Sequence, residues 1–255
     1  MSNLKSLEHF PNVYLDLEHS KIEISQKESV LFVLDSLTHV FNLFLPLNGA
    51  ERLIIALDQD IPCPVCYKLH GQIKLKAQPQ KWNQLAYQFA HELCHYLIPA
   101  FTPANLGWLE ESICEMSSYY FLPKISKYWK RINANKCTSE GEPYYPYFTS
   151  YVESEKMKAQ IFDISQLCHT PAPSVLKELE SDEYIRDKNS HIANCILPIF
   201  KKRYLTWHAV PYLGNIKANQ TLTDSLKEWI ELSPQESRAG LIEIAHLFGA
   251  SESLL

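Results

Sequence analysis

Apolar residues recur at three- and four-residue steps between residues 80 and 98, and this period predicts an amphipathic helix. Its apolar stripe consists of Trp82, Leu85, Ala86, Phe89, Leu93 and Tyr96. A second, polar stripe on another face consists of Gln84, Gln88, His91 and His95. Pro99 ends the pattern, as proline does at a helix terminus. We therefore expect the two histidines of this helix to face a cleft and not the core.

The N-terminal pattern predicts a strand followed by a helix. Apolar and polar residues alternate over residues 12–24, which is typical of a strand, here with a turn near His19. Ser25 and Glu28 have the spacing of a capping box, so we expect the helix to begin there and to end before Pro46. Its predicted apolar face consists of Val30, Val33, Leu34, Leu37, Val40, Phe41 and Phe44.

Two further strands are expected before the histidine-bearing helix. Residues 52–57 form a short apolar run, which favours a buried strand. Residues 72–77 alternate apolar positions with lysines, and this pattern predicts an edge strand whose charges point outward. Residues 58–66 lie between these strands and predict a loop that holds Cys63 and Cys66.

Helical periodicity dominates the C-terminal half. Residues 134–149 contain glycine and prolines, and they predict a loop between the two halves. Beyond it we expect helices over 174–180, 182–204, 207–213, 223–232 and from Pro234 to just before Gly249, the second of them bent or divided at Pro198. The sequence thus predicts an α+β chain with a mixed part over residues 1–133 and a helical part over residues 150–255.

Composition narrows the classes of function. The 255 residues are 46% apolar and 21% charged, with a net charge of −5, which gives no general attraction to nucleic acid or to anionic membranes. No stretch reaches the roughly 18 apolar residues of a membrane span. Because the first 20 residues contain no uninterrupted apolar h-region, we do not expect them to act as a secretory signal. The seven cysteines are odd in number and scattered, which suits a reducing compartment. We expect a cytoplasmic protein without nucleic-acid or membrane partners, and the sequence leaves its oligomeric state open.

Candidate chemistry lies in the predicted helix, where residues 91–95 read His-Glu-Leu-Cys-His, the HExxH form. Side chains four residues apart on a helix share one face, so His91 and His95 can hold one metal ion. Glu92 lies beside them, where its carboxylate could polarise a water molecule at the metal. Cys94 points away from that face. The alternative is a pair of ordinary helix histidines, and the residues on the C-terminal side of the helix decide between the two.

Residues 108–111 read Trp-Leu-Glu-Glu, and together with HExxH they resemble the gluzincin clan of zinc metallopeptidases. In that clan a second helix, often with the pattern WLxEG, supplies a glutamate as the third zinc ligand. The resemblance implies that Glu111 is this ligand, although Ser112 stands where the clan usually has glycine. It also implies that Glu115, one turn further on, hydrogen-bonds a zinc-bound histidine, and that a peptide adds to the strand at residues 72–77.

The resemblance implies a function as well as a fold. It indicates a zincin-like fold with a small mixed sheet over residues 1–133. It also indicates a Zn²⁺-dependent hydrolase that cleaves a peptide or amide bond in a peptide or protein substrate. His91, His95 and Glu111 would be the metal ligands, and Glu92 would be the general base. Members of the clan also place a tyrosine or histidine over the metal to stabilise the oxyanion. The candidates here are Tyr144, Tyr145, Tyr147, Tyr151 and His208, and the sequence does not choose among them.

Three alternatives stay open. Ser112 is compatible with a zinc-binding scaffold or regulator whose peptidase cleft is degenerate. Peptide deformylases also use HExxH and take an upstream cysteine as the third ligand, a role that Cys63 or Cys66 could fill. The third alternative is a narrow regulatory protease that acts on one protein. Since no second cysteine pair accompanies Cys63 and Cys66, we favour two unlinked thiols in a loop over a structural zinc site.

Overall fold

The computed structural model describes residues 4–20, 22–45 and 52–251. The chain divides into two compact units: the first consists of residues 1–96 and 117–154, and the second of residues 97–116 and 155–255. The α+β class and the small mixed sheet that the sequence predicts are confirmed. Helix α3 (Gly107–Arg131) contributes residues to both units.

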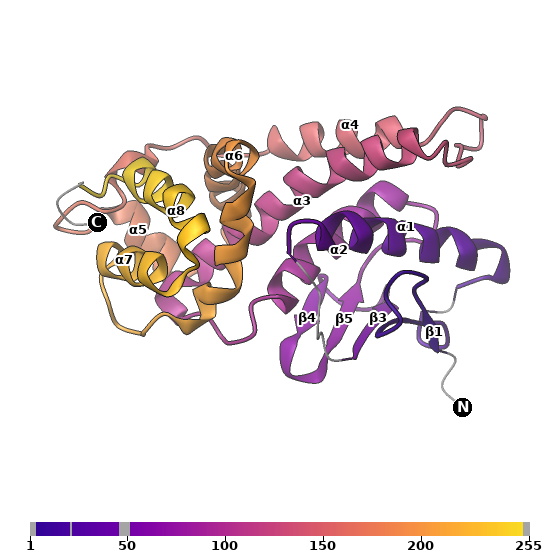
Figure 1. Cartoon of the computed structure of the whole chain (residues 1–255), viewed down its shortest axis with the longest axis horizontal. Helices are drawn as coiled ribbons and strands as arrows, with labels where there is room; N and C mark the ends of the chain where they lie inside the picture. Colours follow the sequence, from indigo (N-terminus) through magenta and orange to yellow (C-terminus); the bar gives the residue numbers. More distant parts are fainter. Residues whose placement is uncertain (1–3, 21, 46–51, 252–255) are drawn as a thin grey trace. The chain divides into compact units, whose positions relative to one another are not determined.

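A five-stranded mixed sheet lies in the first unit, in the order β1-β2-β3-β5-β4. The strands are β1 (Leu4–Ser6), β2 (Val13–Asp16), β3 (Leu53–Leu57), β4 (Val65–Tyr67) and β5 (Gln72–Leu75). The β2–β3 and β3–β5 pairs are parallel, whereas β1–β2 and β4–β5 are antiparallel. Helices α1 (Ile24–Asn42) and α2 (Trp82–Tyr96) lie on the same side of this sheet (Figure 1). The buried strand expected at residues 52–57 is therefore confirmed as β3.

The prediction of an edge strand at residues 72–77 is wrong. Strand β5 lies between β3 and β4, so both of its hydrogen-bonding edges are already paired. The alternating lysines mark a polar face of the sheet and not a free edge: the ammonium of Lys74 contacts the carboxylate of Asp58 at 3.2 Å. Part of the expected loop forms β4 instead, with Cys66 opposite Ile73. A peptide cannot add to β5, and the strand at this end of the sheet is β4.

Helix α1 begins two residues earlier than the capping box predicts, in which Ser25 is the N-cap. Its N-cap is Glu23, which makes no side-chain capping hydrogen bond, and the expected strand ends at Asp16. The helix ends at Asn42, and Pro46 lies outside the described residues. The apolar face is confirmed for Val30, Val33, Leu34, Leu37, Val40 and Phe41, which are all buried, while Phe44 is half-buried.

The first unit also contains the second part of α3 and most of α4. The structure continues α3 through Pro123 as far as Arg131, and α4 (Tyr145–Lys156) begins inside the range that predicts a loop. Aromatic packing accounts for this early start: the ring of Phe148 meets that of Trp129 edge to face, with centroids 4.9 Å apart. Burying such a ring gives the segment a reason to fold as a helix, although its prolines predict a loop.

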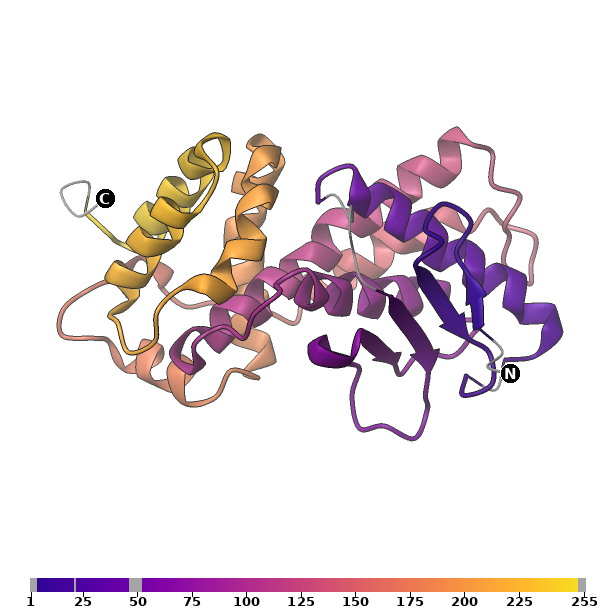
Figure 2. The same cartoon turned by 60° about the horizontal axis from the view of Figure 1, so that its bottom comes forward.

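The second unit is helical, as the sequence predicts (Figure 2). Its elements include the α-helices α5 (Ser174–Ser181), α6 (Arg186–Lys202), α7 (Leu222–Leu232) and α8 (Gln235–Leu247), with the 3-10 segments η2 (Ala104–Leu106), η3 (Ile164–Gln166) and η4 (Tyr204–Asn215). The expected helix at 207–213 is part of η4. Helix α8 begins one residue later than predicted, since Pro234 is its N-cap and not its first helical residue. Trp229 anchors α7 to η4 because its buried indole N–H donates to the carbonyl of Ala209 at 2.9 Å.

A histidine–aspartate pair ties the start of the first unit to α1. The Asp35 carboxylate accepts hydrogen bonds from the backbone N–H of His9 at 2.9 Å and from its ring Nδ1 at 2.6 Å. The hydrogen bond to Asp35 raises the pKa of His9 above 6.5, although partial burial opposes the shift. The stabilisation from this pair is therefore complete below about pH 6.5 and is lost as the pH rises through the folded-state pKa of His9.

We expect substitution of Asp35 by asparagine to lower the pKa of His9 towards its ordinary value, because the charge-assisted hydrogen bond is lost. Proton NMR titration of the imidazole resonances measures this shift, and the His9→Gln variant assigns the resonance. The stability difference between wild type and Asp35→Asn should be larger at pH 5.5 than at pH 8.5. An unchanged His9 titration in the variant would contradict the assigned cause.

Candidate metal centre

The two faces of α2 differ as the sequence predicts, except at the two ends of the apolar stripe. Leu85, Ala86, Phe89 and Leu93 are buried, whereas Trp82 and Tyr96 are half-buried. The polar stripe is half-buried throughout, at Gln84, Gln88, His91 and His95. Gln88 uses its amide to donate to the carbonyl of Lys76 at 3.3 Å. Helical spacing alone therefore brings the two imidazoles together on a side that is not packed into the core.

The imidazoles of His91 and His95 approach each other closely. Their Nε2 atoms are 3.2 Å apart, and the ring planes are inclined by 60°. Two nitrogens bound to one tetrahedral zinc ion at about 2.05 Å each would be about 3.3 Å apart. The observed separation is therefore close to what a zinc ion requires, and the same two atoms form a hydrogen bond if one of them carries a proton.

A carboxylate joins this pair. Ligand atoms of His91, His95 and Glu111 all lie within 4.8 Å of one another, and all three side chains are half-buried. This limit includes the separation of about 3.3 Å between ligands of a tetrahedral zinc ion. Two neutral imidazoles and one carboxylate form a ligand set that zinc accepts while a fourth position stays available. The residues present thus fit a zinc ion.

Two serines of α3 fix that helix against α2. The hydroxyl of Ser117 donates to the carbonyl of Ala90 at 2.9 Å, and the hydroxyl of Ser118 donates to the carbonyl of Tyr87 at 2.8 Å. All four groups are buried, where a missing partner would cost about 1–3 kcal/mol. Ala90 directly precedes His91 in α2, so these bonds set the position of the histidine-bearing turn relative to α3.

The remaining acids of the predicted site lie in different surroundings. Glu92 is buried, with 6% of its surface exposed, and follows His91 in α2. Glu115 accepts a hydrogen bond from the hydroxyl of Ser190 at 3.3 Å, and its expected bond to a histidine stays a prediction. Ser112 is buried and donates to the carbonyl of Trp108 at 2.7 Å, so the helix accommodates serine where the clan usually has glycine.

A second ligand set shares one histidine with the first. His95, Glu110 and Cys114 also place ligand atoms within 4.8 Å of one another. Glu110 and Cys114 are buried, and the Glu110 carboxylate accepts a hydrogen bond from the Thr102 hydroxyl. Sequence reasoning missed Cys114, although its four-residue distance from Glu110 puts both side chains on one helix face. Since both sets need His95, they compete for one metal ion.

Cys63 and Cys66 are outside every metal-ligand group found in the described part of the chain. Cys63 is exposed, and Cys66 is half-buried in β4. No disulfide joins any of the cysteines within that part. The absence of a structural zinc site at these cysteines stays a prediction, whereas their common placement in a loop is wrong for Cys66.

The candidate oxyanion donors make packing contacts. Tyr144 donates its hydroxyl to the side-chain oxygen of Asn83 at 3.1 Å, and burial raises its pKa above the usual value. Its ring packs against that of Tyr147 at a centroid distance of 5.3 Å, and Tyr151 meets Tyr87 edge to face at the same distance. The ring Nδ1 of His208 lies 3.5 Å from a carboxylate oxygen of Glu236. The ammonium of Lys130 lies 6.0 Å above the ring centroid of Tyr145. These contacts do not single out one of the five residues, so the choice of an oxyanion donor stays open.

Comparisons with known proteins give no relative to guide the assignment. The chain matches no protein-family model, no curated protein and no solved structure at a significant level.

Within the described residues, every helix is too short or too polar to cross a lipid bilayer.

Proposed function

We propose that this protein is a zinc-dependent hydrolase that cleaves a peptide or amide bond in a peptide or protein substrate. The observation that carries the proposal is the pair of Nε2 atoms of His91 and His95 at 3.2 Å, with Glu111 in reach. The HExxH pattern and the second, glutamate-bearing helix support it, and a zincin-like core is part of the same proposal. A cytoplasmic location fits the composition.

Each residue of the centre has a separate task in this proposal. His91, His95 and Glu111 would hold the ion. When bound, zinc supplies a Lewis acid that polarises a carbonyl group and acidifies water. The carboxylate of Glu92 accepts the proton of the attacking water and passes it to the leaving amine. Its buried position keeps bulk water from competing for that proton.

One observation favours a second candidate function, a zinc-binding scaffold or regulator without turnover. The set of His95, Glu110 and Cys114 includes a thiol and two buried side chains. Cysteine ligands in closed surroundings are typical of structural zinc sites. A metal held there would leave Glu92 without a catalytic task.

Metal content tests the proposal directly. We expect elemental analysis of the purified wild type to give about one zinc ion per chain, because three protein ligands suffice for a stable site. His91→Ala and His95→Ala should lose the metal, and Glu111→Ala should lose most of it. Glu115→Ala is the control: loss of a supporting hydrogen bond typically weakens metal binding by about 10–100-fold, so saturating zinc should restore its occupancy.

The same measurement separates the two ligand sets. Cys114→Ser and Glu110→Gln should retain zinc if Glu111 is the third ligand. Metal loss in these two variants, with full occupancy in Glu111→Ala, would overturn the hydrolase proposal and support the scaffold. If Glu115→Ala loses the metal at saturating zinc while Glu111→Ala keeps it, Glu115 and not Glu111 is the third ligand.

A further inference from the structure

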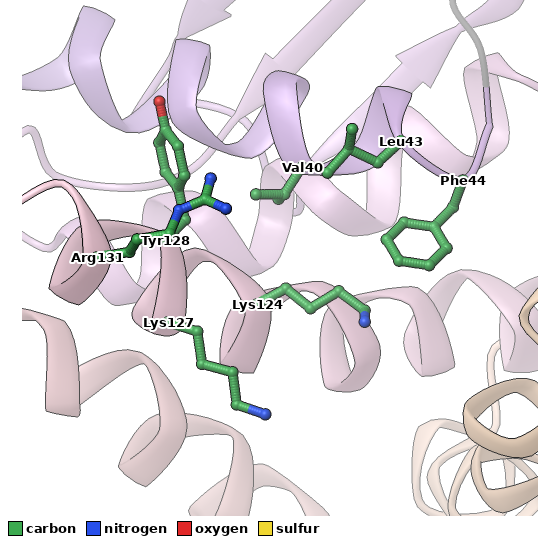
Figure 3. Close-up of a pocket in the computed structure, with 7 residues that line it drawn as sticks. All are labelled: Val40, Leu43, Phe44, Lys124, Lys127, Tyr128 and Arg131. Carbon is green, nitrogen blue, oxygen red and sulfur yellow. The ribbon is translucent and has the colours of Figure 1, made fainter.

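A pocket of about 220 Å³ lies in the first unit between the end of α1 and the second half of α3. Figure 3 shows Val40 in the last turn of α1, with Leu43 and Phe44 directly after that helix, opposite Lys124, Lys127, Tyr128 and Arg131 of α3. One wall is thus apolar and the other is cationic. We call this site the α1/α3 pocket, and it shares no residue with the metal centre.

The apolar wall is incompletely covered. Leu43 exposes 65% of its surface, although it is a large aliphatic side chain directly after a helix whose apolar residues Val40 and Phe41 are buried. Beside it, Phe44 is half-buried, and the ammonium of Lys124 lies 4.4 Å above its ring centroid. An exposed apolar side chain beside a cation–π pair provides a place where another apolar group can be buried.

The helix dipole does not explain all of the basic residues in the cationic wall. Basic residues in the last turn of a helix complement its dipole, and Lys130 and Arg131 occupy that turn. Lys124 and Lys127 lie one to two turns earlier, where the dipole effect has decayed. Among the described residues, no carboxylate forms an ion pair with Lys127 or Arg131 within 4.0 Å. In a chain with a net charge of −5, this wall is a local reversal of charge.

The spacing of the cations selects the kind of anion. From Lys124 to Arg131 the helix rises by about 10 Å, and the charged groups of the three basic side chains point in separate directions (Figure 3). One phosphate or carboxylate cannot contact all three. Several carboxylates along a peptide can, since an extended chain advances by about 3.3 Å per residue.

The volume of the pocket also favours a peptide over a small molecule. Sites that enclose a whole small molecule usually measure about 300–1,000 Å³. A pocket of about 220 Å³ is better suited to one or two side chains that project from a longer ligand. We propose that the α1/α3 pocket binds an acidic peptide segment of a partner protein, with an apolar side chain against Leu43 and Phe44 and carboxylates along Lys124, Lys127 and Arg131.

A display library of random dodecapeptides, presented to the full-length protein, tests this proposal. We expect enriched peptides to combine Asp or Glu with Leu, Ile or Phe, and binding to weaken as salt screens the charges. The Lys127→Glu variant should bind an enriched peptide about tenfold more weakly, because an attractive contact becomes repulsive. Leu43→Ser should weaken binding by about fivefold through lost apolar burial.

Lys130→Glu is the matched control, because it makes the same charge change on the same helix outside the pocket. All three substituted side chains are exposed, so folding should not be affected. If Lys127→Glu and Lys130→Glu lose the same amount of peptide affinity, general electrostatic attraction explains the binding and the proposal is overturned. Absence of acidic, apolar peptides among those enriched would also overturn it. Binding to phosphatidylserine vesicles without such enrichment would assign the pocket to a membrane surface instead.

Discussion

Replacing Glu92 by glutamine is expected to slow peptide hydrolysis by about 10²–10⁴-fold, the contribution usual for a general acid–base residue. The amide has nearly the size and shape of the carboxylate but cannot accept the proton of the attacking water. Since Glu92 is not among the proposed ligands, the variant should still bind zinc. Cleavage of a peptide mixture followed by mass spectrometry measures the rate, and elemental analysis measures the metal.

Glu28→Gln is the matched control, because this substitution also replaces a carboxylate by an amide, at an exposed position of α1. It should leave the rate unchanged. A Glu92→Gln protein that hydrolyses peptides at the wild-type rate would refute the general-base role. If the wild type holds zinc but cleaves no peptide in the mixture, the scaffold gains support.

Truncation of Phe121 to alanine should destabilise the first unit by about 3–5 kcal/mol, the usual cost for a buried phenylalanine. Its ring is fully buried and stacks on Phe41 with centroids 3.9 Å apart, so it joins α1 to α3. Removing it leaves a cavity where two helices meet. Urea denaturation measured by circular dichroism should show a lower midpoint, and the thermal midpoint should fall by roughly 10 °C.

Leu43→Ala is the control for this truncation. Leu43 lies at the end of the same helix but is 65% exposed, so its loss should change the stability by less than about 0.5 kcal/mol. Similar losses from both substitutions would show that α1 and α3 do not pack in the way described.

Long periodic segments could be predicted from the sequence because many residues repeat one signal. Helix α2 shows an apolar stripe over four turns and a proline after its end, and its two faces appear in the structure as expected. The same periodicity puts His91 and His95 on one face of the helix, so their proximity needs no tertiary contact. The histidine pair could therefore be predicted from local geometry, whereas Glu111 was expected only from the resemblance to gluzincins, because its place beside the pair depends on a second helix.

Short elements and exact helix starts could not be predicted. Strand β4 has three residues, too few for a period to be visible. Its formation depends on pairing with β5, in which Cys66 lies opposite Ile73. Lys74 of β5 and Lys76 after it suggested an edge because a polar sheet face and a free edge give the same alternation. The cap positions of α1 and α8 each differ from the predicted ones, since weak local capping preferences compete with packing of the whole helix.

The serine bonds between α2 and α3 imply that the metal centre can be adjusted from outside its ligand sphere. Ser117 and Ser118 donate to carbonyls one turn apart, so sliding either helix by a single residue would break both bonds. A bulkier residue such as valine at position 117 would move the two helix axes apart. The imidazoles and the carboxylate would then separate, and affinity for zinc, whose bonds to nitrogen and oxygen measure about 2.0–2.2 Å, would fall although every ligand had been kept.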